Sequence, residues 1–248
     1  MVLFLDLFLE NFILRFRHQI KSEVRKISKT YLITGTNRGI GLEYCRQLKE
    51  RGKEVIAVCR SPSEELNSLG VRIEANVDLT SKSAVEDLVT RLDGQNIDVL
   101  INNAGIVERI SLDNLDLDSI RRQFEVNAIA PLYFTKALLP NLDRGSKVVL
   151  MTSRMGSIDD NTSGGSYGYR MSKVALSMAG KSLSVDLKPQ GIAVAILHPG
   201  LVQTRMTNFN QAGITTETSV RGLLARIEAL NLENTGTFWH QNGEILPW

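Results

Sequence analysis

Tyr169 and Lys173 are the two side chains of this sequence whose types and spacing most clearly suggest chemistry. They stand four residues apart in Tyr-Arg-Met-Ser-Lys, and because a helix turns once in about 3.6 residues, they share one helix face. A phenol has an ordinary pKa of about 10, and a nearby ammonium group favours the phenolate and lowers that pKa. The spacing therefore predicts a pair that moves a proton to or from a substrate oxygen near neutral pH.

A glycine-rich turn near the start of the chain predicts a phosphate site. Thr34-Gly-Thr-Asn-Arg-Gly-Ile-Gly41 follows a short apolar run and leads into a helical pattern. Glycines permit a tight turn, and backbone N–H groups at a helix N-terminus bind a pyrophosphate. The strand–turn–helix context favours a dinucleotide site over a plain glycine-rich loop.

The chain that must position these residues alternates short apolar runs with helical stretches. The expected strands are 31–34, 54–58, 71–75, 98–102, 147–151 and 192–196. The expected helices are 39–51, 83–92 with a capping box at its start, 117–140 with a bend at Pro131, 166–187 and 217–230. Such alternation predicts a single α/β domain with a doubly wound parallel sheet and helices on both faces.

Composition and charge limit the possible partners. The chain has 248 residues, 43% of them hydrophobic, and a net charge of +2, which gives no sign of a nucleic-acid partner. Cys45 and Cys59 are the only cysteines, and we expect them to be reduced core residues in the cytoplasm. The three histidines lack the spacing of metal ligands, so no metal site is expected.

Residues 1–29 are expected to form an apolar and basic extension outside the domain. The stretch from Val2 to Phe16 is very apolar but carries Asp6 and Glu10, so it is too short and too charged for a spanning helix of about 20 apolar residues. Its flanks do not match a secretory signal. Two interpretations stay open: a helix at a membrane surface or a partner protein, and a disordered or loosely docked extension.

Several motifs in the right order give the chain a family resemblance. It resembles the short-chain dehydrogenases/reductases, in the motifs Thr34–Gly41, Asn102-Asn103-Ala104-Gly105, Asn127, Ser153, Tyr169 with Lys173, and Pro199-Gly200 with Thr204. Tyr167-Gly-Tyr169, His198-Pro-Gly200 and Gly243–Trp248 are similar to the C-factor and sniffer-type carbonyl reductase branch. The resemblance covers residues 30–248 and implies a Rossmann-type fold. Tyr169 follows Ser153 by sixteen positions, a spacing longer than in most of the family.

The resemblance implies reduction of an aldehyde or ketone by hydride transfer, or the reverse reaction. Tyr169 is then the proton donor, and Lys173 lowers the pKa of Tyr169 and binds the nicotinamide ribose. Ser153 bonds the carbonyl oxygen, and Asn127 holds a water that links Lys173 to solvent. The positions implied for cofactor binding are Gly35, Thr36, Asn37, Arg38, Gly39, Ile40, Gly41, Arg60, Asp78, Leu79, Asn103, Ala104, Gly105, Tyr169, Lys173, Pro199, Gly200, Val202 and Thr204.

Two arginines predict which dinucleotide binds. An acid about 20 residues beyond the glycine turn would bind the ribose hydroxyls and repel a phosphate, but Arg60 stands there instead, and Arg38 lies inside the turn. Because a guanidinium makes bidentate bonds to phosphate, we expect NADP(H) rather than NAD(H). The alternative is that both arginines are solvated surface residues. Asp78 is either an adenine contact, as the resemblance implies, or a helix cap.

The segment 201–218 is expected to cover the substrate pocket. It carries the apolar Met206 and Phe209, a single base in Arg205, and no acid before Glu217. This composition favours a neutral, moderately apolar carbonyl compound.

A second interpretation has the chain as a binding or signalling module that senses NADP(H), because relatives of C-factor type are linked to signalling. The complete set Asn127, Ser153, Tyr169 and Lys173 argues against a purely non-catalytic role. The family often pairs through its two long helices, which implies a homodimer or homotetramer.

Overall fold

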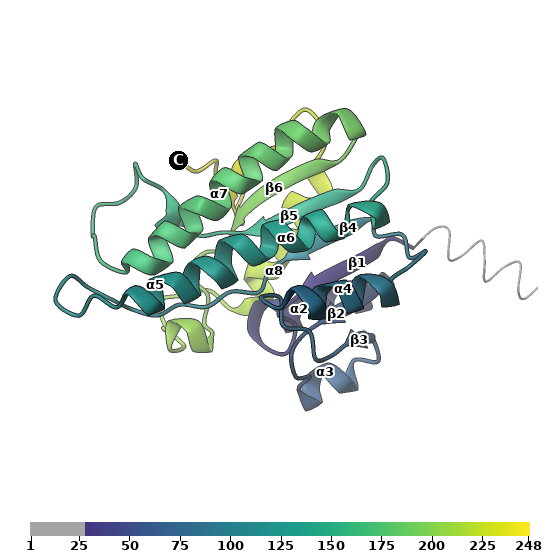
Figure 1. Cartoon of the computed structure of the whole chain (residues 1–248), viewed down its shortest axis with the longest axis horizontal. Helices are drawn as coiled ribbons and strands as arrows, with labels where there is room; N and C mark the ends of the chain where they lie inside the picture. The colour runs from purple at the N-terminus through teal and green to yellow at the C-terminus, as the bar shows by residue number, and fades with distance from the viewer. Residues whose placement is uncertain (1–27) are drawn as a thin grey trace, which may run out of the picture.

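A seven-stranded parallel sheet is the central layer of the computed structural model, which describes residues 28–248 (Figure 1). The strands are β1 Thr30–Thr34, β2 Glu54–Val58, β3 Arg72–Glu74, β4 Val99–Asn102, β5 Lys147–Met151, β6 Ala193–His198 and β7 Phe238–His240. Their order is β3-β2-β1-β4-β5-β6-β7, and every neighbouring pair is parallel. The predicted doubly wound parallel sheet is therefore confirmed.

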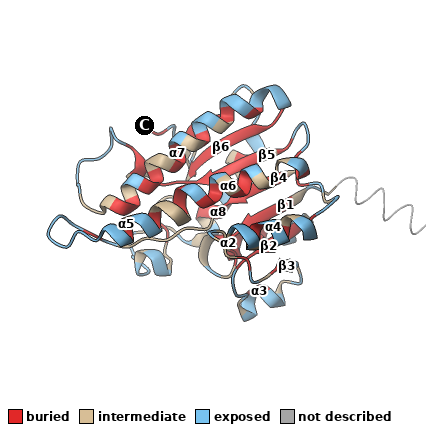
Figure 2. Cartoon of the chain, in the orientation of Figure 1, coloured by how far each residue is buried: buried red, intermediate tan, exposed pale blue. Residues whose placement is uncertain are grey.

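Helices cover both faces of this sheet. They are α2 Gly39–Glu50, α3 Glu64–Ser68, α4 Lys82–Arg91, α5 Leu117–Phe124, α6 Ala130–Ala137, α7 Tyr167–Leu187 and α8 Thr216–Ala229. Successive residues of β1 point to opposite faces, so Ile33 packs with α2 and α8 while Leu32 packs with α4, α6 and α7. Figure 2 shows the resulting buried strands beneath helices whose outer sides are exposed.

The strand order reverses between β1 and β4. From β1 the sheet continues to β2 and β3 on one side, and from β4 it continues to β5, β6 and β7 on the other. Parallel α/β sheets bind their ligands outside the carboxyl ends of the strands at such a point. The turn after β1 and the loop after β4 meet there, because Asn103 Nδ2 donates to the carbonyls of Thr34 at 2.9 Å and Gly35 at 3.3 Å. The fold thus places the glycine turn at the switch point.

The prediction of one continuous helix over 117–140 is wrong. A π-helical turn, Glu125–Ile129, separates α5 from α6 and contains Asn127. Pro131 lies in the first turn of α6, where a missing N–H is tolerated. The irregularity therefore falls just before Pro131 and places Asn127 at the interruption.

The capping box predicted at Ser83 is also wrong. Ser81 is the N-cap of α4, because its Oγ accepts the N–H of Ala84 at 3.3 Å. The Oγ of Ser83 lies 3.1 Å from that of Ser81, and the N-cap therefore lies two residues before the predicted one.

Two short elements had no sequence prediction, α3 and the edge strand β7. Among residues 28–248 no helix has both the length and the apolar character needed to cross a membrane. The interpretations given to the apolar stretch from Val2 to Phe16 lie outside the described residues.

Candidate active site

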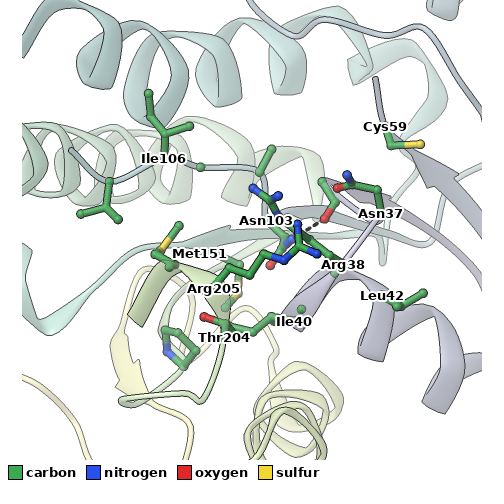
Figure 3. Close-up of a pocket in the computed structure, with 18 of the residues that line it drawn as sticks. Asn37, Arg38, Ile40, Leu42, Cys59, Asn103, Ile106, Met151, Thr204 and Arg205 are labelled. Carbon is green, nitrogen blue, oxygen red and sulfur yellow. Dashed lines mark hydrogen bonds between the residues drawn. The ribbon is translucent and has the colours of Figure 1, made fainter. Parts of the chain in front are cut away.

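A cavity of about 980 Å³ opens at the carboxyl ends of the strands. Its walls come from the residues that follow β1, β2, β3, β4, β5 and β6. Figure 3 shows the glycine turn, Asn103 and Met151 around it, with Thr204 and Arg205 on the segment that follows β6. This is the position at which doubly wound sheets bind their ligands.

Most of the positions implied for cofactor binding meet in this cavity. The residues that line it are Gly35, Asn37, Arg38, Gly39, Ile40, Gly41, Arg60, Asp78, Leu79, Asn103, Ala104, Gly105, Tyr169, Lys173, Pro199 and Thr204. Thr36, Gly200 and Val202 do not line it. Thr36 is fully buried and its Oγ1 donates to the carbonyl of Val58 at 3.2 Å, so its side chain supports the turn from beneath.

The glycine turn leaves no room for larger side chains. Gly35 has a φ of +71°, and a Cβ there would lie 2.8 Å from Ala104 Cα. A Cβ on Gly41 would collide with the carbonyl oxygen of Gly35. Because both positions require glycine, α2 begins directly beneath the turn and the backbone facing the cavity stays uncovered, as a diphosphate site requires.

Tyr169 and Lys173 occupy one buried face of α7, as their spacing predicts. The Nζ of Lys173 lies 5.7 Å from the ring centroid of Tyr169, and it donates to the carbonyl oxygen of Met151 at 2.9 Å. Both residues are buried, with 8% of Tyr169 and 4% of Lys173 exposed. The pair therefore sits at the wall of the cavity that β5 and α7 form together.

Burial has the largest influence on the pKa of each residue of the pair. Burial raises the pKa of Tyr169, and a hydrogen bond with Ser153 opposes that rise. Burial also lowers the pKa of Lys173 to about 8. That Lys173 lowers the pKa of Tyr169 stays a prediction, because desolvation is the largest influence on the Tyr169 pKa in this structure and the ammonium group donates to the carbonyl of Met151.

Ser153 lies where a short turn brings it next to α7. It is buried and caps the 3-10 turn Arg154–Gly156, accepting the N–H of Met155 at 3.1 Å. A Cβ on Gly156 would lie 2.8 Å from the carbonyl carbon of Lys173, so only glycine lets the turn approach the helix this closely. Its opposing effect on the pKa of Tyr169 makes Ser153 a neighbour of the phenol, although Ser153 does not line the cavity itself.

Asn127 joins the loop after β4 to α7. Its Oδ1 accepts the N–H of Ile106 at 2.8 Å, and its Nδ2 donates to the Ile106 carbonyl at 2.9 Å and to Ser172 Oγ at 3.0 Å. Both amide protons are therefore taken by protein atoms. Oδ1 is the side-chain atom with spare hydrogen-bonding capacity for the water implied there.

The sequence of the described fold matches a known family. Residues 29–214 match the family model of the short chain dehydrogenases. The chain belongs to this family.

Sequence similarity to individual proteins agrees with this assignment. The 1-hydroxy-2-glutathionyl-2-methyl-3-butene dehydrogenase of Rhodococcus sp. strain AD45 is 41% identical over 224 residues, which cover 88% of this chain and 99% of the relative. The C-signal protein of Myxococcus xanthus is 46% identical over 155 residues, or 61% of this chain and 93% of the relative.

Solved structures of carbonyl reductases share the fold. The NADPH-bound carbonyl reductase from chicken fatty liver has a TM-score of 0.82 at 29% identity, covering 89% of this chain and 99% of that one. The carbonyl reductase Sniffer of D. melanogaster has a TM-score of 0.81 at 30% identity, covering 89% and 100%. The predicted family and its C-factor and sniffer-type branch are confirmed.

Two arginines that the sequence prediction missed fix the conformation of the long segment between Ser153 and Tyr169 in this short chain dehydrogenase. Arg170 donates from α7 to the Met155 carbonyl at 3.2 Å, to Ser163 Oγ at 2.8 Å and to the Gly164 carbonyl at 3.2 Å. Arg154 pairs with Asp160 at 3.0 Å and with Glu244 at 2.6 Å. Each arginine directly follows a candidate catalytic residue, which is the only sequence signal of this role.

Asp78 belongs to the turn that precedes α4. Its Oδ1 accepts the N–H of Thr80 at 2.9 Å and the Thr80 hydroxyl at 2.7 Å. These hydrogen bonds lower the pKa of Asp78, and the charge of Arg60 adds to the effect. Since Ser81 caps the helix, the helix-cap alternative for Asp78 is wrong, and the carboxylate lines the cavity beside Arg60.

Lys173→Met is expected to stabilise the protein at pH 7. The drop of the Lys173 pKa from 10.5 to about 8 means that burying the ammonium group destabilises the folded state by about 3 kcal/mol. Loss of its hydrogen bond to Met151 in the variant costs about 1 kcal/mol. The expected gain of about 2 kcal/mol raises the melting temperature by about 5 °C, which calorimetry measures.

The pH dependence of the Lys173→Met effect identifies its cause. Between pH 8 and 10.5 the unfolded wild type binds more protons at Lys173 than the folded one, so wild-type stability rises with pH. The advantage of the variant must therefore shrink at pH 10 relative to pH 7. An advantage that is constant with pH would contradict the buried-charge explanation and point to packing alone.

Proposed function

We propose that this short chain dehydrogenase is an NADPH-dependent oxidoreductase that reduces an aldehyde or ketone to an alcohol, or runs the reverse reaction. The observation that carries the proposal is the buried Tyr169, beside Ser153 and Lys173, in the wall of a cavity that the glycine turn also lines. The similarity to a carbonyl reductase with bound NADPH supports it.

The residues of the cavity fit a dinucleotide with a 2′-phosphate. Gly35 and Gly41 uncover the backbone for a diphosphate. Arg38 and Arg60 both line the cavity, and neither forms an ion pair with another residue in the part of the chain that the structure describes. Arg60 follows β2, where the ribose hydroxyls or their phosphate are bound in this type of sheet.

The proposed chemistry assigns one task to each buried polar residue. When bound, the nicotinamide supplies a hydride to the carbonyl carbon. Tyr169 gives its phenol proton to the carbonyl oxygen as negative charge develops there. Ser153 donates a hydrogen bond to the same oxygen, and Lys173, mostly cationic below its pKa of about 8, stabilises the phenolate that remains.

Asn127 is proposed to position the other three residues. It ties Ile106 at the cavity wall to Ser172, one residue before Lys173. The π-helical turn that contains Asn127 makes this bridge possible, because it interrupts the regular helix at the point where α5 packs against α7.

A sensor of NADP(H) without turnover is the second candidate, favoured by the 46% identity to the C-signal protein. The buried phenol of Tyr169 beside Lys173 and Ser153 counts against it, since cofactor binding alone does not require a positioned phenol. NADPH oxidation across a panel of aldehydes, quinones and α-dicarbonyls separates the two. Turnover of any of them supports the reductase, and tight NADPH binding with no turnover across the panel supports the sensor.

The substrate is proposed to be a neutral, moderately apolar carbonyl compound. Ile106, Val107, Met206 and Phe209 supply apolar surface to the cavity. Arg109 also lines the cavity, and the sequence prediction missed it because its loop has no regular pattern.

The remaining proposals concern organisation. We propose residues 30–248 as the dinucleotide-binding domain and residues 1–29 as an extension that contacts a membrane or a partner in the cytoplasm. We propose a homo-oligomer that pairs through α5 and α7, since large apolar side chains of these helices are exposed: Leu117, Met171, Met178 and Val185.

A further inference from the structure

We propose that Gln123 is a positioning residue that fixes the part of the cavity wall formed by residues 106–109 and so sets the affinity for the carbonyl substrate. The proposal rests on the proposed function, because it assumes that this cavity binds a carbonyl compound. Gln123 lies in α5, four positions before Asn127, and it does not itself line the cavity.

The wall segment 106–109 has no secondary structure of its own. Ile106, Val107 and Arg109 line the cavity, and Figure 3 shows Ile106 among the lining side chains. Backbone N–H and C=O groups that leave water need hydrogen-bond partners. The groups that bond this segment therefore determine where its side chains lie.

Two amide side chains bond the wall segment in the same way. Glu108 donates its N–H to Gln123 Oε1 at 3.0 Å and accepts from Gln123 Nε2 at 3.1 Å. Ile106 makes the equivalent pair of bonds with Asn127, at 2.8 and 2.9 Å. Alternate residues of an antiparallel strand bond their neighbour through both N–H and C=O in this manner. The two amides therefore hold the segment as a neighbouring strand would, and Asn127 by itself fixes only the Ile106 end.

Gln123 is itself held firmly. Its side chain is fully buried, and Nε2 also donates to Ser119 Oγ at 3.2 Å. A Cβ on Gly168 would lie 2.6 Å from Gln123 Nε2, so α7 covers the amide closely at the residue before Tyr169. Because a buried polar network with its hydrogen bonds made is rigid, Gln123 fixes the wall segment relative to the helix that carries Tyr169.

Substrate affinity is the property that this arrangement controls. Loss of the Gln123 amide leaves the partly buried N–H and C=O of Glu108 without these partners, and the two groups regain hydrogen bonds only by turning toward water. The wall then shifts at Val107 and Arg109, on either side of Glu108. The glycine turn keeps its bonds from Asn103, so the cofactor site keeps its shape.

Amide hydrogen exchange of the full-length protein tests the positioning without turnover. In the wild type the amides of Ile106 and Glu108 are expected to exchange slowly although they lie in a loop, because both donate to buried side chains. Gln123→Met keeps the length of the side chain and removes the amide, so it should speed exchange at Glu108 more than at Ile106. Rapid exchange at Glu108 in the wild type, which needs no variant to observe, would overturn the proposal.

Steady-state kinetics tests the effect on the substrate. Gln123→Met is expected to raise KM for the best carbonyl substrate about tenfold and to leave kcat within about threefold, the pattern of an interaction that binds substrate and transition state alike. The affinity for NADPH, measured by titration, should stay within about twofold of the wild type. A lower kcat at unchanged KM would place the effect on Tyr169 through Gly168 and overturn the proposal.

Asn141→Leu is the matched control. Asn141 is also a buried amide, and its Nδ2 donates to the backbone carbonyls of Leu92 at 2.8 Å and Gln95 at 2.9 Å, but it does not line the cavity. The substitution should lower the melting temperature without raising KM. An equal rise of KM in both variants would show general loosening of the fold and contradict a specific role of Gln123.

Failure of the wild type to turn over any carbonyl of the panel would overturn the proposed function instead. The exchange rates at Ile106 and Glu108 would then still decide whether Gln123 fixes the wall, since they require no substrate.

Discussion

Tyr169→Phe is expected to lower kcat by a factor of about 10³ with the best carbonyl substrate, within the usual range for the loss of a positioned general acid. The change removes only the phenol oxygen, so the buried ring still packs beside Lys173. We therefore expect the affinity for NADPH to stay within about twofold of the wild type, because the ring keeps its position in the wall of the cavity. Single-turnover kinetics and cofactor titration measure the two quantities separately.

Tyr167→Phe is the matched control for this experiment. Tyr167 lies in the same first turn of α7 and is only half-buried, and the residue four positions after it is Met171 rather than lysine. Its replacement should leave kcat close to the wild-type value. Turnover of Tyr169→Phe above about a tenth of wild type would contradict general acid catalysis by Tyr169, and equal losses in both variants would show damage to the helix instead.

The sheet and the main helices were predictable because local pattern specifies them. Strands buried on both faces are short continuous apolar runs, such as 54–58 and 147–151, and these six runs became six of the seven strands. β7 has only three residues at the sheet edge, too few to give a pattern. The π-helical turn at Asn127 was not predictable either, because it depends on hydrogen bonds to Ile106 and Ser172 from distant parts of the chain.

The positions of the site were more predictable than its electrostatics. Residue types and order placed Tyr169 and Lys173 on one face, and the structure agrees. Whether an ammonium group lowers the pKa of a neighbour depends on burial and on the other hydrogen bonds of the ammonium group. A four-residue spacing predicts neither of these. The same limit applies to Arg170, whose bonds to Met155 and Gly164 arise from a loop fold that no periodic pattern describes.

Arg60→Asp is expected to raise the Michaelis constant for NADPH about a hundredfold and that for NADH by less than about threefold. The change removes a charged hydrogen bond to the 2′-phosphate, worth about 1.5–3 kcal/mol, and adds repulsion of about 1 kcal/mol between like charges. NADH has no phosphate there, and an acid at this position can bond the ribose hydroxyls instead. Steady-state kinetics with both cofactors and one common carbonyl substrate give the ratio.

The neighbourhood of Arg60 makes this reversal stronger than a simple surface change. Arg60 is the positive charge that lowers the pKa of the neighbouring Asp78, so Arg60→Asp would bring two carboxylates together where the structure now has one cation and one anion. Arg60→Gln removes the cation without adding an acid, and it should therefore raise the NADPH constant by a smaller factor of about ten. If both variants change the constants for NADPH and NADH equally, Arg60 does not contact the 2′-phosphate, and cofactor preference must come from Arg38.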